Sequence, residues 1–148
     1  CPDARISVLS NATMLHKKDV FDALMLVDNN IQKLDTVSSD FISRVDQPCQ
    51  RHYDVNRVVD QLTDFQGHVI IQTMFLQGQF EGVDVDNTTP SYVDPWLKAL
   101  QKIGPEQVMV YTIDRETPVS TLRKATAEQL DSIARKVERL GLKCSVSY

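Results

Sequence analysis

The stretch that decides the fold is HVIIQTMFL, His68 to Leu76. It is almost continuously apolar, and such runs are typical of strands that are covered on both faces, as in parallel sheets. A second run of this kind, VMVYTI, spans Val108 to Ile113. Between the two runs, Ser91 to Ile103 has the apolar spacing of a helix and is followed by Gly104 and Pro105, which stop helices. The pattern therefore predicts a parallel βαβ unit.

The same alternation extends towards both ends of the chain. Further expected strands are Ile6 to Ser10, Ile31 to Asp35 and Leu142 to Val146, and further expected helices are Asp19 to Leu26, a stretch with Phe41, Ile42 and Val45, Val55 to Phe65, and Thr126 to Leu140. Right-handed βαβ connections predict a mainly parallel sheet with helices outside it. An open doubly wound sheet, a small whole barrel and part of a larger (βα) barrel all fit. Eight βα units need roughly 200 residues or more, which exceeds this chain.

Length and composition suit one α/β domain over residues 1–148. Of its residues, 42% are hydrophobic and 24% are charged. A chain of this size and composition can form a hydrophobic core that is stable without disulfide bonds or a structural metal. Its net charge is -4, whereas proteins that bind nucleic acid through phosphates are usually basic. No apolar run is long enough for a membrane span. Cys1, Cys49 and Cys144 fit neither a disulfide framework nor a zinc site, so we expect a cytoplasmic protein.

Sites in parallel βα architectures collect at the carboxyl ends of strands. The polar residues at these ends are Ser10 and Asn11, Lys33 and Asp35, Gln72, and Tyr111, Asp114 and Arg115. Lys33 and Asp35 lie two positions apart and therefore share a face of their strand, where they would form an ion pair or bind a polar ligand. A surface ion pair at a strand end fits the pattern equally well. The amide of Gln72 needs a partner inside its apolar run, and a side chain of a neighbouring strand is the simplest one.

Two charged segments follow strands. Arg115 could anchor a carboxylate or a phosphate, although a solvated turn also explains Asp114 to Glu116. The segment Glu81 to Asn87 resembles a calcium loop in its acidic spacing but lacks the required Gly and distal Glu, so we expect a solvated loop. No GxGxxG, Walker A or GxSxG sequence is present.

Taken in order, five segments resemble the later part of radical S-adenosylmethionine (radical SAM) proteins, and most of all bacterial Fe-S oxidoreductases. They are ISVLSNATML, IQKLDT, VIIQTMFLQG, VMVYTIDRETP and LKCSVSY. VLSNAT resembles the TNGT segment of the family's third strand, with Ser10 in place of Thr and Ala12 in place of Gly. IQKLD, QTMFLQG and VYTIDR resemble the fourth, fifth and sixth strands. The resemblance implies an incomplete TIM-like barrel, namely strands three to six of a (βα)6 barrel.

The resemblance also implies a cofactor. In this family three cysteines of a CxxxCxxC loop hold a [4Fe-4S] cluster, and S-adenosylmethionine bound to it yields a 5′-deoxyadenosyl radical that abstracts hydrogen from a substrate. The implied cofactor pocket contains Ser10, Asn11, Lys33, Asp35, Gln72 and Tyr111, with Asp114 and Arg115 at its rim. Lys33 and Asp35 would contact the ribose or the carboxylate of the cofactor. The loops Gly78 to Pro90 and Glu116 to Ala125 would face an unknown substrate.

The CxxxCxxC loop is absent from this sequence, so no metal-ligating or catalytic residue is carried over. Because the chain also starts at Cys1 rather than Met, we expect a C-terminal fragment of an enzyme, inactive by itself. The alternative is a self-contained doubly wound α/β module that binds a small ligand or regulates. Strand order separates the two, since only a doubly wound sheet reverses direction at a switch point. An open barrel edge would leave apolar surface and backbone groups uncovered, so we expect either self-association there or a terminal segment that moves into the gap.

Overall fold

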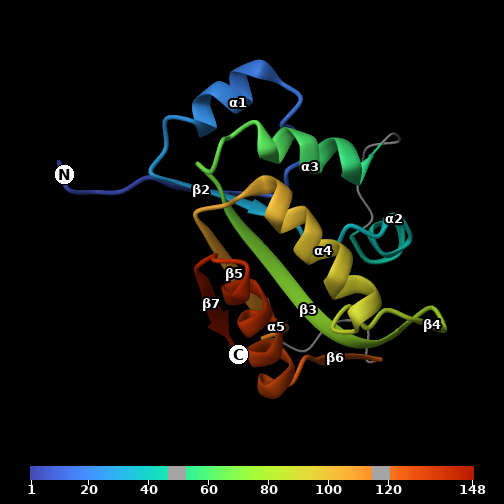
Figure 1. Ribbon diagram of the computed structural model, residues 1–148. Helices are drawn as coiled ribbons and strands as arrows, with labels where there is room; N and C mark the ends of the chain where they lie inside the picture. Colours follow the sequence, from blue (N-terminus) through green and yellow to red (C-terminus); the bar gives the residue numbers. More distant parts are fainter. Residues whose placement is uncertain (47–52, 115–120) are drawn as a thin grey trace.

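A computed structural model describes residues 1–46, 53–114 and 121–148 (Figure 1). Its main sheet contains β1 (Ser7–Ser10), β2 (Asn29–Lys33), β3 (Ile70–Phe80), β5 (Gln107–Thr112) and β7 (Cys144–Ser147), in that spatial order. Each neighbouring pair of these strands is parallel. The order follows the sequence and never reverses, so the doubly wound alternative is wrong. The sheet is a section of a (βα) barrel.

The helical elements are α1 (Lys18–Leu24), α2 (Ser39–Phe41), the π-helical turn η1 (Ile42–Asp46), α3 (Val55–Thr63), α4 (Pro90–Ile103) and α5 (Ala127–Arg139). Local sequence explains where the longer ones begin and end. Thr126 and Gln129 form a complete capping box at the start of α5. Gly104 ends α4 in the left-handed conformation, with a φ of 59°. The end of α4 at Gly104 agrees with the prediction from the sequence. Among the described residues, none of the helices is long and apolar enough to span a membrane.

The helices pack on one face of the sheet. Alternate strand residues, such as Ile71 and Phe75 of β3 and Val108 and Val110 of β5, join the core cluster. The same cluster takes the apolar stripes of four helices, which include Leu24, Val58, Leu62, Trp96, Leu100, Leu130 and Val137. In Figure 1, α4 runs along β3 and α5 lies over β5 and β7. Because side chains alternate across a strand, the intervening residues face away from the helices.

A small antiparallel sheet extends the carboxyl end of β3, which the sequence does not predict. β3 continues to Phe80 and pairs antiparallel with β4 (Val83–Asp84) and β6 (Leu122–Lys124). The segments expected to be loops, Gly78 to Pro90 and Glu116 to Ala125, therefore contain strand residues. A second apolar cluster of Phe41, Leu76 and Val85 supports this extension.

Candidate functional site

The face of the sheet that is turned away from the helices carries the candidate site. Its members by alternation are Ser7, Leu9, Asn29, Ile31, Lys33, Ile70, Gln72, Met74, Gln107, Met109, Tyr111, Ser145 and Ser147. None of these residues belongs to the core cluster beneath the helices. In a closed (βα) barrel this face would line the interior.

The strand register shows which residues of this face lie side by side. Leu9, Ile31 and Ile70 are register partners across β1, β2 and β3 and form an apolar row, which the polar Gln107 of β5 continues. Further along the strands, Lys33 of β2 pairs in register with Gln72 of β3, whose other register partner is Met109 of β5. The polar row lies towards the carboxyl ends, where sites of parallel α/β proteins collect.

Lys33 and Asp35 form an ion pair on this face. Lys33 Nζ lies 3.0 Å from Asp35 Oδ2, and the side chains are 33% and 3% exposed. β2 ends at Lys33, two residues before Asp35, so the strand is shorter than predicted, but the expected ion pair is formed. Asp35 Oδ1 also accepts a hydrogen bond of 2.8 Å from the backbone N–H of Met74. The two interactions offset the cost of burying the carboxylate and leave the half-exposed ammonium facing the open side.

Gln72 and Tyr111 lie near this pair on the same face, and both are half-buried. Among the described residues, no hydrogen bond engages the side-chain amide of Gln72. The expected bond to a neighbouring strand's side chain is therefore not formed, and the amide is available to a ligand. Tyr111 lies in β5, opposite Met74 of β3 in register.

Asn87 positions the segment that contains Asp35, and the prediction that Glu81 to Asn87 form a solvated loop is wrong for this residue. It is 1% exposed. Its Nδ2 donates to the Met74 carbonyl at 2.8 Å and to the Asp35 carbonyl at 3.4 Å, and its Oδ1 accepts from Leu76 N at 2.8 Å. It thus ties the segment that holds Asp35 to β3. The sequence contains a signal for this burial. In VDVDN, Val85 and Asn87 are two positions apart and both are buried, as expected for a segment whose alternate residues face the core.

Ser10 and Asn11 follow each other at the end of β1. Ser10 is even-numbered like Val8, which packs against the helix-side core, and its Oγ accepts a hydrogen bond from Ala12 N, so Ser10 does not share the face of Lys33. Asn11 is exposed and accepts from Thr13 Oγ1. It follows Ser10, the register partner of Gln32, and its place in a cofactor pocket stays a prediction.

Beyond β5, Asp114 is exposed past the end of the strand. Arg115 lies outside the described residues. A role for either residue at the rim of a cofactor pocket stays a prediction.

The cysteines that the structure describes do not form a cluster site. Cys1 is exposed near the N-terminus, and Cys144 is half-buried in β7. Burial, followed by the charge of Glu138, raises the pKa of the Cys144 thiol to about 11, which disfavours the thiolate that iron would require. Within the described residues, no group of three or more His, Cys, Asp or Glu side chains is placed to hold a metal ion. The described residues therefore do not fit a [4Fe-4S] cluster, and Cys49 lies outside them.

Comparison with protein-family models gives no match. Among curated proteins, the chain is 23% identical over 140 residues to the GTPase Obg of Brachyspira hyodysenteriae. The alignment covers 92% of this chain but only 19% of that protein. No Walker A sequence occurs in the chain, so the aligned part does not carry this phosphate-binding motif.

Several solved structures share the architecture. A domain of the pyruvate-formate lyase-activating enzyme from Bacteroides vulgatus matches with a TM-score of 0.71 and 11% identity, over 97% of this chain and 82% of that one. A radical SAM methyltransferase from Sphaerobacter thermophilus matches with a TM-score of 0.70 and 15% identity, over 94% and 39%. SuiB from Streptococcus suis, bound to S-adenosylmethionine, matches with a TM-score of 0.62 and 13% identity, over 96% and 32%. The chain therefore has the α/β fold of a section of the barrel in radical SAM enzymes.

Proposed function

We propose that this chain is the S-adenosylmethionine-binding section of a radical SAM enzyme. In the longer protein, a segment that precedes residue 1 would supply the CxxxCxxC loop and its [4Fe-4S] cluster. The complete enzyme would generate a 5′-deoxyadenosyl radical and abstract hydrogen from its substrate. The chain by itself would bind the cofactor without cleaving it.

The observation that carries the proposal is the Lys33–Asp35 ion pair on the open face of the sheet. The pair lies at the carboxyl end of parallel strands whose order matches a barrel. Burying a carboxylate beside a partly exposed ammonium costs desolvation free energy, which a surface that serves only packing would avoid with apolar residues. It suits a ligand that carries both hydroxyl groups and a carboxylate.

The chemistry of the neighbouring residues agrees with such a ligand. Lys33 would attract the carboxylate of S-adenosylmethionine, and Asp35 would accept hydrogen bonds from its ribose hydroxyls or amino group. The Gln72 amide offers both donors and an acceptor in the adjacent register position. Two comparisons support this assignment: one structure with the same fold is a radical SAM methyltransferase, and another holds S-adenosylmethionine.

Titration calorimetry of the chain with S-adenosylmethionine tests the proposed binding. We expect saturable binding that weakens about tenfold in Lys33→Gln, because the variant loses a hydrogen bond to a charged group. Lys18→Gln is the matched control, since Lys18 forms an exposed ion pair with Asp22 on α1. Binding that is absent from the wild type, or that is unchanged in Lys33→Gln, would contradict the assignment of this face.

The activity of the longer protein needs a separate experiment. The coding sequence before residue 1 should contain CxxxCxxC, and the anaerobically reconstituted protein should form 5′-deoxyadenosine from S-adenosylmethionine. A longer protein without the three cysteines, or one that forms no 5′-deoxyadenosine after reconstitution, would disprove the proposed enzyme class.

A further inference from the structure

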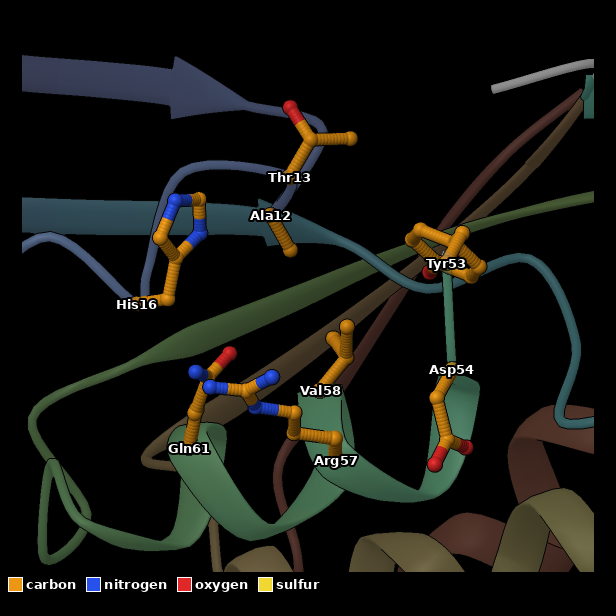
Figure 2. Close-up of a pocket in the computed structure, with 8 residues that line it drawn as sticks. All are labelled: Ala12, Thr13, His16, Tyr53, Asp54, Arg57, Val58 and Gln61. Carbon is orange, nitrogen blue, oxygen red and sulfur yellow. The ribbon is translucent and has the colours of Figure 1, made fainter. Parts of the chain in front are cut away.

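A small pocket lies on the other side of β1, away from the Lys33–Asp35 pair. It has a volume of about 40 Å³ and lies between the loop that follows β1 and the helix α3 (Figure 2). The lining residues are Ala12, Thr13, His16, Tyr53, Asp54, Arg57, Val58 and Gln61. Ala12 and Val58 are buried members of the helix-side core. The pocket is therefore separate from the open face of the sheet.

The helix contributes one continuous stripe to the pocket. Asp54, Arg57, Val58 and Gln61 follow the spacing that places residues on one face of a helix. Val58 forms an apolar floor together with Ala12, while the polar residues surround it. Figure 2 shows Arg57 and Gln61 extending towards the same end of the pocket, with His16 opposite them on the loop.

Three side chains that line the pocket carry hydrogen-bond donors without a partner among residues 1–46, 53–114 and 121–148. Within the described residues, Arg57 takes part in no ion pair, and the side chains of His16 and Gln61 form no hydrogen bond. Asp54 forms no ion pair with Arg57 within the described residues, and its Oδ1 accepts a hydrogen bond of 2.9 Å from Asn56 N at the start of α3. Figure 2 shows this carboxylate turned away from His16. The guanidinium, the imidazole and the amide therefore line one pocket from two elements that are distant in sequence.

The donor set and the volume select the class of ligand. A guanidinium presents paired N–H groups that match the oxygens of a phosphate. A cavity needs about 10–15 Å³ of this kind of volume for one water molecule, so 40 Å³ suits a compact oxyanion. We propose that this pocket binds a phosphate group, either as free phosphate or as the end of a small phosphorylated metabolite whose remainder stays outside.

Two-dimensional ¹H–¹⁵N NMR of the chain, titrated with inorganic phosphate, tests the proposal. Sodium chloride at matched ionic strength is the reference, because it reproduces general screening of charges. We expect saturable shifts confined to the loop from Thr13 to Lys17 and to the turn from Arg57 to Gln61. Shifts that rise linearly without saturation, or that spread over all basic surfaces, would overturn the proposal.

Substitutions locate the site. Arg57→Gln should weaken phosphate binding about tenfold, and His16→Gln should weaken it measurably. Arg135→Gln on α5 is the control, because Arg135 is also exposed and its loss changes the net charge equally. Since Arg57 is exposed, its variant should keep the circular dichroism spectrum and melting temperature of the wild type. Equal phosphate affinity in Arg57→Gln and the wild type would refute the site.

The source of the phosphate group is resolved by a second titration. A small phosphate monoester such as glycerol phosphate is compared with inorganic phosphate. Tighter binding of the monoester, with shifts that extend to Tyr53, would identify a phosphorylated metabolite. Equal or weaker binding would identify free phosphate. Neither result depends on S-adenosylmethionine, so this inference and the proposed function succeed or fail separately.

Discussion

At the scale of single residues, Asn87 determines how the Lys33–Asp35 pair is held. Its amide satisfies two carbonyl groups and its oxygen satisfies one backbone N–H in a dry environment. Asn87→Ala would leave these backbone groups buried without partners, each at a cost of about 1–3 kcal/mol. We expect a loss of about 3 kcal/mol in the free energy of unfolding, measured by urea denaturation.

Asn11→Ala provides the comparison for this variant. Asn11 is exposed and bonds only a nearby side chain, so its substitution should change the stability by no more than about 0.5 kcal/mol. Equal stabilities of the Asn87 and Asn11 variants would show that Asn87 does not hold β3 to the preceding segment.

Cys144 allows a prediction about pH. Its thiol pKa is raised to about 11 by burial and, to a lesser extent, by the charge of Glu138. In a chain with Ser at positions 1 and 49, alkylation of Cys144 by iodoacetamide should therefore increase with pH around a midpoint near 11 in the folded protein. The midpoint should fall to about 9 in denaturant, the ordinary value for a thiol.

The same shift predicts how stability depends on pH. The folded state holds the thiol proton more tightly than the unfolded state. Its contribution to stability is therefore complete below pH 9 and is lost as the pH rises from about 9 to 11. Cys144→Ala should remove this part of the pH dependence. A folded-state alkylation midpoint near 9 would contradict both expectations.

The sequence predicts contacts between residues that are close together along the chain. Lys33 and Asp35 are two positions apart, and strand alternation alone predicts that they meet. Asn87 was missed because its partners lie 11 to 52 positions away along the chain. Ser10 is a candidate because it lies at a strand end and in the TNGT-like segment, and neither feature tells which face of the strand its side chain takes; like Val8, it lies on the helix side.

At the scale of elements, the pairing of β3 with β6 depends on Gly78. Gly78 has a φ of +116°, and a Cβ built there would lie 2.0 Å from the backbone oxygen of Thr121. Gly78→Ala must therefore separate the two strands. We expect the variant to lose at least about 2 kcal/mol of stability through strain and lost pairing, with fast amide hydrogen exchange in Leu122–Lys124.

Gly82→Ala is the matched control in the same antiparallel extension. Gly82 also has a positive φ, +76°, but a Cβ there would meet nothing within 4 Å. Its substitution should cost only the backbone term of about 1 kcal/mol and leave the exchange of β6 unchanged. Similar losses for the two variants would mean that the close approach to Thr121 is not what requires Gly78.

The elements of the main sheet were predictable, and the antiparallel extension was not. Apolar runs, Gly104 and the capping residues of α5 are strong local signals. In contrast, β6 is the short polar segment LRK, which becomes a strand only because β3 lies beside it. The end of β3, QGQF, contains glycine and glutamine, residues that alone favour a turn.

At the scale of the whole molecule, the βαβ pattern predicts the order of the strands in the sheet. It does not predict that one face of the sheet has no helices over it. Apolar runs such as VIIQTMFL indicate strands covered on both sides, whereas helices cover only one side here. On the other side, Ile70 is buried but Leu9 at the edge strand is 62% exposed. The exposure therefore increases towards β1, where the parallel pairing ends.

The edge at β1 leads to the last prediction. Within the described part of the chain, β1 pairs only with β2, so one row of its backbone groups faces outward next to the exposed Ile6 and Leu9. Two such edges related by a twofold axis would pair with each other and bury both side chains. We propose that a second copy of the chain occupies this edge, and sedimentation velocity should show a dimer that forms with increasing concentration.

Leu9→Lys should shift the protein to monomer, because charges on an edge strand oppose pairing. Leu26→Lys should not, since Leu26 is 87% exposed but follows α1 rather than lying in the edge strand. A wild-type monomer at all accessible concentrations, or equal effects of the two substitutions, would exclude β1 as the interface.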